Sequence, residues 1–334
     1  MSTKPRIFCP GGLRPVAVEQ LARNDSIVLI GPPPEKASRA EILQLIRENQ
    51  PIHGLVGYLN PVNDEVLDAC GPELKVVSTP SVGFDHISVP SLASRSVRLG
   101  HSPSILNHAV AETCVLLVLA TLRKWNGMQK ALKSGDWSVN HIPLGNDLRH
   151  LNIGIIGLGR VGLECAYRLA PFGCVIRYTD IRPVPVATVT GQGSLEYVPG
   201  ADLLAEKSDM LVVACDLNAS TRGMVGERLL RKLRGGKGGW VVNVGRGPVV
   251  DQDALVRGLK EGWVQGAGLD VMDPEPLPPN HELLSLENAV LLPHQGTATV
   301  ETRDSMALMC VENGIKGAHG QLMPAEIDMA RYRK

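Results

Sequence analysis

The sequence carries no net charge of either sign. Its 334 residues include 34 Lys and Arg and 34 Asp and Glu, so the formal charge at pH 7 is zero and the pI is near 7.1. A neutral chain has no electrostatic attraction for nucleic acid or for an anionic membrane surface. No segment offers the ~18 uninterrupted apolar residues of a membrane span, and the N-terminus lacks the apolar region of a signal peptide. We therefore expect a cytoplasmic protein without nucleic-acid or membrane partners.

Cysteine is present but shows no pairing pattern. The seven cysteines are odd in number, scattered, and never spaced as C-x-x-C, so we expect neither a disulfide framework nor a zinc site. His101 and His108 have no third ligand nearby in the sequence, and no metal is expected. Aromatic residues are also few: with three Phe and five Tyr, a wholly aromatic pocket is not expected.

Several catalytic motifs are missing as well. The sequence contains no G-x-S-x-G, no H-E-x-x-H and no G-x-x-x-x-G-K-[ST]. Serine hydrolases, zinc proteases and P-loop NTPases depend on these motifs. Those three classes therefore lose their main support.

Short apolar runs alternate with segments of helical period along most of the chain, which predicts an α/β fold with parallel sheets. At 334 residues the chain is longer than single-core domains usually are, which indicates two domains. The first set of expected strands comprises RIFC (Arg6–Cys9), SIVLIG (Ser26–Gly31), HGLVGY (His53–Tyr58), KVVSTP (Lys75–Pro80) and SVRLG (Ser96–Gly100). The second set comprises GIIGL, CVIRYTD, MLVVAC, WVVNVG, GAGLDV and AVLLP.

A helical segment lies between the two sets of strands, at Asn107–Trp125. It is apolar nearly all round, which is typical of a buried helix. A final helix is expected to start near Thr299, in ATVETRDSMALMCVENGIKGA. Because no strand remains for it in the second set, we expect it to return to the first domain.

A glycine-rich turn occurs in NIGIIGLGRVGLECAYRLAPFG, residues 152–173, where Gly157, Gly159 and Gly162 match G-x-G-x-x-G. Alone, this motif is weak in a chain with 35 glycines. Here an apolar strand enters the turn, a helical segment leaves it, and the next strand ends in Asp180, which is typical of a dinucleotide-binding unit. A glycine corner without a ligand remains the alternative.

Each part of this motif has a chemical role. Gly157 permits a tight turn, Gly159 lets the backbone approach a pyrophosphate, and Gly162 allows close packing of helix and strand. The Asp180 carboxylate would accept hydrogen bonds from the adenosine ribose and repel a 2′-phosphate, so NAD(H) is expected and NADP(H) is less favoured. Arg182 would soften that preference by pairing with a phosphate.

Three residues at consecutive strand ends predict a hydride-transfer site. Arg246 follows WVVNV and would grip a carboxylate, Glu275 lies in the MDPEP loop, and His294 follows AVLLP. His294 would exchange a proton with a carbonyl, and Glu275 would orient its ring and favour the imidazolium. Individually, the three residues also suit a surface ion pair, a solvated loop acid and a structural histidine.

The sequence resembles the D-isomer-specific 2-hydroxyacid dehydrogenases along nearly its whole length. The matching segments are SVGFDHI, AVAETCVLLVLATLRK, NIGIIGLGRVG, YTD, LLAEKSDMLVVACDLNAST, VVNVGRGPVVDQDAL, GAGLDVMDPEPLP and LLPHQGTAT. The resemblance implies two Rossmann-like domains with the active site in the cleft between them. The substrate domain would comprise residues 1–104 and 299–334, and the NAD-binding domain residues 105–298.

The resemblance also implies roles for individual residues. Arg246, Glu275 and His294 would be catalytic, and Val82, Gly83 and Arg246 would bind the substrate. Asp270 would contact the nicotinamide amide. The coenzyme site would comprise Gly157, Gly159, Arg160, Val161, Gly162, Asp180, Cys215, Asp216, Leu217, Thr221, Val244, Gly245, Asp270, His294 and Gly296. The family usually dimerises through its coenzyme domain, and residues Trp125–His141 would form an arm, so a homodimer is expected.

The chain departs from the family pattern at two places. Asp216 and Leu217 stand where many members have a proline before the leucine, which puts the shape of the adenine pocket in doubt. Gln295 follows His294 where isoleucine is common, so the pocket beside the substrate or nicotinamide could differ. Formate dehydrogenases of this superfamily carry glutamine at the position of Glu275, so the acid argues against formate as the substrate.

Two functions of different class follow from these observations. The first is an oxidoreductase that uses NADH to reduce a small 2-oxo acid, of the glyoxylate or hydroxypyruvate type, to the D-2-hydroxy acid. The second is a non-catalytic, NAD-binding interaction protein like the co-repressors that share this fold. Those proteins usually add a long disordered tail, which this sequence does not show.

Overall fold

The computed structural model describes residues 4–138, 140–185 and 195–332. The chain divides into two compact units, unit 1 (Met1–Leu106 and Ala298–Lys334) and unit 2 (Asn107–Thr297). These divisions fall close to the expected domain boundaries. The assignment of one unit to the substrate and the other to the coenzyme stays a prediction. Within the described residues, no helix is both long and apolar enough to cross a membrane.

Unit 1 contains a five-stranded parallel sheet in the order β2-β1-β3-β4-β5. Its strands are β1 (Arg6–Phe8), β2 (Val28–Ile30), β3 (Gly54–Val56), β4 (Val76–Ser78) and β5 (Arg98–Gly100). All five expected strands are therefore confirmed, each in a shorter form. Apolar residues alternate between the two faces of the sheet, since Ile7 and Phe8 belong to separate core clusters, as the pleat requires.

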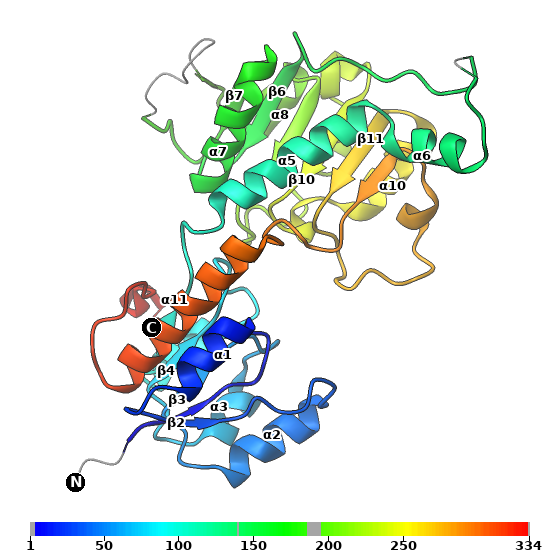
Figure 1. Cartoon of the computed structure of the whole chain (residues 1–334). Coiled ribbons are helices and arrows are strands. Elements are labelled where there is room, and N and C mark those ends of the chain that lie inside the picture. The colour runs from blue at the N-terminus through cyan, green and yellow to red at the C-terminus, as the bar shows by residue number, and fades with distance from the viewer. Residues whose placement is uncertain (1–3, 139, 186–194, 333–334) are drawn as a thin grey trace. The chain divides into compact units, whose positions relative to one another are not determined.

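Helices cover both faces of this sheet (Figure 1). The Phe8 cluster includes residues of α2 (Arg39–Glu48), α3 (Asp64–Cys70) and α4 (Val89–Ser94), whereas the Ile7 cluster includes residues of α1 (Pro15–Ala22) and α11 (Val300–Ala318). Thr299 caps α11, because its side chain accepts a hydrogen bond from the Thr302 N–H. Helix α11 packs against α1, β3 and β4, so residues from both ends of the chain build this core.

Unit 2 contains a seven-stranded parallel sheet in the order β12-β11-β10-β9-β6-β7-β8. Its strands are β6 (Asn152–Ile156), β7 (Val175–Thr179), β8 (Glu196–Tyr197), β9 (Met210–Val213), β10 (Gly239–Asn243), β11 (Val264–Leu269) and β12 (Ala289–Leu291). Six of these strands confirm the expectation. The pattern missed β8, an edge strand of two residues, because so short a strand shows no alternation.

The strand order of unit 2 runs outward in both directions from neighbouring strands β6 and β9. This order is that of a dinucleotide-binding fold with one added strand, and its ligand site lies at the carboxyl ends of the strands where the order reverses. The register aligns those ends, because Ile156 pairs with Thr179 on one side and with Val213 on the other. Residues after β6, β7 and β9 therefore meet at one edge.

Helices of unit 2 are α5 (Asn107–Leu122), α6 (Trp125–Lys133), α7 (Arg160–Leu169), α8 (Ala201–Glu206), α9 (Glu227–Leu230) and α10 (Gln252–Glu261). Helix α5 packs against α7, β10 and β11. It approaches β11 closely at Gly268, where a Cβ would lie 2.7 Å from Thr121 Oγ1. The expected single helix to Trp125 is interrupted, since Lys124 adopts φ 52° and the left-handed conformation ends regular helix.

Short 3₁₀ segments complete the structure. They are η1 (Ala170–Phe172), η2 (Leu233–Gly236), η3 (Gly247–Val249), η4 (Glu282–Ser285) and η5 (Met329–Tyr332). In unit 2, η1 follows α7, η2 follows α9 and η3 follows β10 within a few residues. Segment η3 begins immediately after Arg246. The candidate site residues of unit 2 thus lie on short connections between regular elements.

Candidate active site

The glycine turn connects β6 to α7, and its backbone requires two of the three glycines. Gly157 has φ +89°, and a Cβ there would lie 2.7 Å from the Cys215 Cα. A Cβ on Gly162 would lie 2.0 Å from the carbonyl oxygen of Gly157, which no side chain tolerates. The turn can therefore close against β9 and the helix can approach the strand only with glycine at these positions.

Gly159 has a different role, because its surroundings are open. It is the N-cap of α7, no side chain caps the helix, and a Cβ would meet nothing within 4 Å. Arg160 and Val161 form the first turn of this ten-residue helix. Unsatisfied N–H groups at a helix start carry partial positive charge and bind phosphate. An uncapped helix start beside a glycine with open space fits the pyrophosphate of a dinucleotide.

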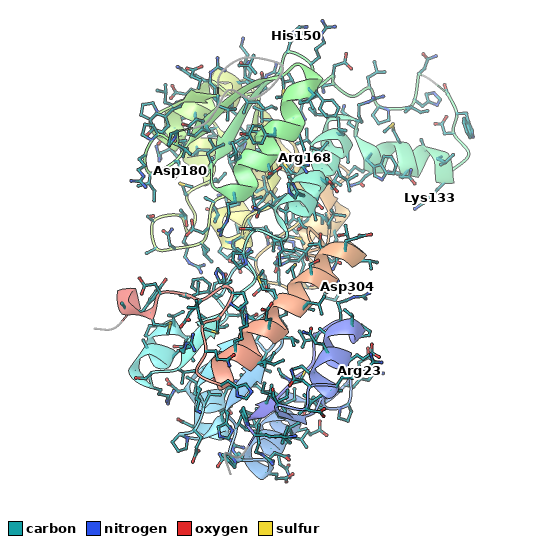
Figure 2. All side chains as sticks on the ribbon, turned by 60° about the vertical axis from the view of Figure 1, so that its left-hand side comes forward. Arg23, Lys133, His150, Arg168, Asp180 and Asp304 are labelled. Carbon is teal, nitrogen blue, oxygen red and sulfur yellow. The ribbon has the colours of Figure 1, made fainter. Side chains whose placement is uncertain are left out.

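Asp180 lies directly after β7 and faces this turn. Its Oδ2 accepts a hydrogen bond of 2.7 Å from the Leu158 N–H, and its Oδ1 accepts one of 2.7 Å from the Ile181 N–H. The backbone thus anchors the carboxylate beside the turn, while each oxygen retains a second acceptor site. Figure 2 labels Asp180 on unit 2. Arg182, two residues further along the chain, is exposed.

The loop after β9 brings further candidate residues to the same edge. Cys215 is the residue nearest to the Cβ position of Gly157. Burial, followed by the negative charge of Asp216, raises the pKa of the Cys215 thiol to about 12, so the thiol is neutral near pH 7. Thr221 Oγ1 closes the loop by donating to the Asp216 carbonyl at 2.8 Å and accepting from the Asn218 N–H at 2.8 Å. Leu217 lies within this closed loop.

Arg246 lies between β10 and η3. Its Nη1 donates to the Gly245 carbonyl at 2.9 Å, and the Gly245 N–H donates to Asn243 Oδ1 at 3.0 Å. Val244 precedes this turn and is buried. At the next residue, a Cβ on Gly247 would lie 1.8 Å from the Met272 carbonyl oxygen. The loop that carries Arg246 is therefore packed directly against the loop that follows β11.

Glu275 and His294 form a hydrogen-bonded pair. Glu275 Oε2 lies 2.7 Å from His294 Nδ1, and Glu275 Oε1 accepts from the Met272 N–H at 2.9 Å. The side chains are 34% and 48% exposed, respectively. The pair is thus accessible to a substrate, and its carboxylate has one oxygen on the backbone and one on the ring.

The pair shifts the protonation equilibria of both members. The hydrogen bond to Glu275 is the largest cause that raises the pKa of His294; with the charges of Glu275 and Asp270 it outweighs burial and the charge of Arg246, which lower it. Burial by itself would raise the pKa of Glu275, but the hydrogen bonds from His294 and Met272 and the charges of His294 and Arg246 hold it below its ordinary value. The arrangement favours an imidazolium beside a carboxylate.

Asp270 has a structural contact that the sequence did not reveal. The residue is 2% exposed, and its two carboxylate oxygens accept from the N–H groups of Gln295 at 2.7 Å and Gly296 at 2.8 Å. Its carbonyl accepts from the His294 N–H at 2.8 Å. Burial raises the pKa of Asp270. Asp270 therefore holds the turn that carries His294, which has a positive φ of 54°.

Unit 2 brings Arg246, Glu275 and His294 together. They follow β10, β11 and β12, which are neighbours in the sheet, and the charge of Arg246 acts on both members of the pair. Among the described residues, no group of three His, Cys, Asp or Glu is arranged to hold a metal. This part of unit 2 therefore holds a guanidinium, an imidazole and a carboxylate hydrogen-bonded to that imidazole, which are groups that carbonyl reduction can use.

Val82 and Gly83 lie in unit 1, in the loop after β4. The Val82 carbonyl is 3.2 Å from His101 Nδ1, and the Gly83 carbonyl accepts from Ser81 Oγ at 2.7 Å. Thr79 Oγ1 is 2.9 Å from Ser81 Oγ. Side chains of the same unit thus fix the orientation of both peptide groups.

The sequence did not single out Gln252, although it contacts the loop of Glu275. Its side-chain amide forms two hydrogen bonds with the backbone of Asp273. Its place in GRGPVVDQDAL, six residues after Arg246, was the only available signal. Position in the sequence alone does not show which loop a side chain reaches.

Known proteins show similarity over most of the chain. The family model described as D-isomer specific 2-hydroxyacid dehydrogenase, NAD binding domain, matches residues 115–296. A glyoxylate reductase of Thermofilum pendens is 41% identical over 87% of this chain and 85% of that protein. A glyoxylate reductase/hydroxypyruvate reductase of Homo sapiens is 40% identical over 83% of this chain and 84% of that protein.

A solved structure shares the fold as well. It is an NADPH-dependent glyoxylate/hydroxypyruvate reductase from Sinorhizobium meliloti, in complex with NADP and malonate. The match has a TM-score of 0.84 and 34% identity, and it covers 99% of each chain. The chain described here belongs to the D-isomer-specific 2-hydroxyacid dehydrogenase family of oxidoreductases, and it contains that family's NAD-binding domain.

Proposed function

We propose that this protein uses NADH to reduce a small 2-oxo acid, of the glyoxylate or hydroxypyruvate type, to the D-2-hydroxy acid. The observation that carries this proposal is the 2.7 Å hydrogen bond between Glu275 and His294, next to Arg246 and in the same unit as the glycine turn. The names of the relatives from Thermofilum pendens and Homo sapiens support this substrate class. The acid at Glu275 argues against formate.

Arg246 binds the substrate carboxylate through paired N–H groups, which a planar guanidinium presents in fixed geometry. Val82 and Gly83 add backbone N–H groups to substrate binding. His294 has its Nδ1 engaged by Glu275, so Nε2 is the nitrogen that delivers a proton to the carbonyl oxygen. The charge of Glu275 stabilises the imidazolium before that step. The ring leaves the step neutral and regains a proton from solvent.

The coenzyme, when bound, supplies the hydride to the carbonyl carbon. Gly157, Gly159 and Gly162 shape its phosphate site, and the N–H groups of Arg160 and Val161 bind the pyrophosphate. Asp180 accepts hydrogen bonds from the adenosine ribose. The remaining coenzyme contacts are assigned to Cys215, Asp216, Leu217, Thr221, Val244, Gly245, Asp270, His294 and Gly296.

We further propose that NADH is preferred over NADPH. The Asp180 carboxylate is anchored where a 2′-phosphate would approach, and two like charges at short range repel each other. Arg182, two residues after Asp180, is a cation that would oppose this repulsion. The Sinorhizobium meliloti relative is NADPH-dependent, so members of this fold accommodate either coenzyme.

A homodimer formed through unit 2 completes the proposal. Helix α6 and the following segment extend from the body of unit 2 (Figure 1), and Lys133 marks the outer end of α6 in Figure 2. This arm exposes large apolar side chains: Trp125 at 49%, Leu132 at 51%, Trp137 at 76% and Leu144 at 83%. Clustered apolar exposure of this kind marks a protein interface. Val139 of the expected arm lies outside the described residues.

Replacing His294 by Ala tests the function. NADH oxidation is measured with glyoxylate, hydroxypyruvate, 2-oxoisovalerate and phenylpyruvate. We expect kcat to fall by about 10²- to 10⁴-fold, the usual contribution of a general acid. The Kd for NADH should rise only a few-fold, because one of several proposed coenzyme contacts is lost while the glycine turn is unchanged. The exposed His319→Ala is the matched control.

Full activity of His294→Ala would refute the assignment of His294 as the proton donor. Nucleotide binding by the unmodified protein without any turnover would favour the non-catalytic alternative.

Replacing Glu275 by Gln tests the pH dependence. Reduction requires protonated His294, so activity is present at low pH and is lost as the pH rises through the pKa of His294. Because Glu275 raises that pKa, its loss should move the descending limb of kcat/KM to lower pH. At pH values above the limb, kcat/KM should fall roughly 10- to 100-fold, as for loss of a charged hydrogen bond. A limb at unchanged pH would contradict the pairing.

Replacing Asp180 by Gly or Asn tests coenzyme choice. The ratio of kcat/KM with NADPH to that with NADH should rise about tenfold or more, since repulsion of the 2′-phosphate disappears. Asn can still accept the hydrogen bond from the Leu158 N–H, so it separates loss of charge from distortion of the turn. The exposed Asp25→Asn serves as the control. An unchanged ratio in both variants would show that Asp180 does not face the ribose.

Analytical ultracentrifugation tests the dimer. The 35.9 kDa chain should sediment at about twice its mass, and Trp137→Ala combined with Leu144→Asp should shift it toward the monomer, because charge and truncation weaken an apolar interface. Leu322 is similarly exposed, at 85%, but lies in unit 1, so Leu322→Asp is the matched control. A dimer that survives the double substitution must use another surface.

A further inference from the structure

Gln252 uses both ends of its side-chain amide to hold one residue of the loop that carries Glu275. Its Oε1 accepts from the Asp273 N–H at 3.0 Å, and its Nε2 donates to the Asp273 carbonyl at 2.5 Å. The amide therefore satisfies the backbone donor and the backbone acceptor of the same residue. This two-point contact fixes the position and the rotation of Asp273, which a single hydrogen bond does not.

The base of this contact is itself fixed. Gln252 is the first residue of α10, and the preceding Asp251 caps the helix by accepting from the Ala254 N–H at 3.0 Å. Helix α10 packs against β11, the strand from which the loop departs. In addition, Gln252 Nε2 lies 3.1 Å from His281 Nε2. The amide is thus held by a helix that packs on the sheet and by contact with His281, the residue before η4.

Among the described residues, exposure and two prolines leave this loop with few other restraints. Residues 273–276 are all exposed, so packing restrains them weakly. Pro274 and Pro276 have no N–H group and cannot donate a backbone hydrogen bond. Glu275 must nevertheless place one carboxylate oxygen on the Met272 N–H and the other on His294 Nδ1. The contact at Asp273 supplies a restraint two residues before Glu275.

We propose that Gln252 is a positioning residue that keeps Glu275 within hydrogen-bond distance of His294. The inference rests on the proposed function, because it concerns the residue that positions Glu275 against His294, the proposed proton donor. Gln252 contacts Asp273 and His281, and it is not among the residues assigned to the substrate or the coenzyme. It acts through Asp273 and then Glu275 on the proton affinity of the ring.

The test replaces Gln252 by Met, which has similar length but forms neither hydrogen bond. The readout is the titration of the His294 ring, followed by NMR of protein with ¹⁵N-labelled histidine and assigned with His294→Gln. Loss of the restraint should loosen the Glu275 contact, so the titration midpoint of His294 should move to lower pH, in the direction seen with Glu275→Gln but by less. This measurement requires neither coenzyme nor turnover.

Two further variants sharpen the result. Gln252→Leu also forms neither hydrogen bond with Asp273 and adds no charge, so it should shift the midpoint to lower pH as Gln252→Met does. Gln44→Met makes the same replacement at an exposed position of α2 in unit 1, where Gln44 contacts Glu48, and should leave the midpoint unchanged. A merely structural role for Gln252 would lower thermal stability without moving the midpoint.

Kinetics provide the second readout. In Gln252→Met, kcat/KM above the descending pH limb should fall about three- to tenfold, as for one or two neutral hydrogen bonds, while the Kd for NADH stays within about twofold. An unchanged His294 midpoint in Gln252→Met, with a shifted midpoint in Glu275→Gln, would overturn this inference and leave the proposed function intact. Absence of turnover in the unmodified protein would refute the function, and the titration would still decide the role of Gln252.

Discussion

The parallel register of the unit 2 sheet is the constraint on which the candidate site depends. The pairs Ile156–Thr179, Ile156–Val213 and Asn243–Leu269 align the carboxyl ends of successive strands. Every residue that follows these strands therefore emerges at one edge. A glycine turn, an anchored carboxylate, a guanidinium and a histidine, which are far apart in the sequence, all lie along that edge.

Backbone contacts then determine how the loops at this edge are held. Gly247 allows the loop of Arg246 to touch the Met272 carbonyl, and Met272 in turn donates to Glu275. The Asp270 carboxylate holds the turn of His294 by accepting hydrogen bonds from the N–H groups of Gln295 and Gly296. The Glu275–His294 pair thus connects two loops that are each tied to the sheet by hydrogen bonds. Such support limits the freedom of side chains that are themselves half exposed, which is what preorganised acid catalysis requires.

Nearby charges set the protonation of the Glu275–His294 pair. Arg246 acts on both members of the pair: its charge lowers the proton affinity of His294 and that of Glu275. The hydrogen bond to Glu275 nevertheless prevails at the ring. The candidate site can therefore hold the Arg246 cation and a protonated His294 at the same time. The proposed reduction of a 2-oxo acid requires both.

The sequence by itself determined the α/β class, eleven of the twelve strands found in the described residues, and the three catalytic candidates. These features depend on local patterns: apolar runs, glycine spacing, and polar residues directly after a strand. The two-residue β8 and the break at Lys124 escaped notice because they leave no periodic signal. Only the tertiary structure decided the partners of Asp270 and the contact of Gln252 with Asp273. Those contacts join residues that are distant in the chain, and the strand register, which no local pattern encodes, brings them within reach.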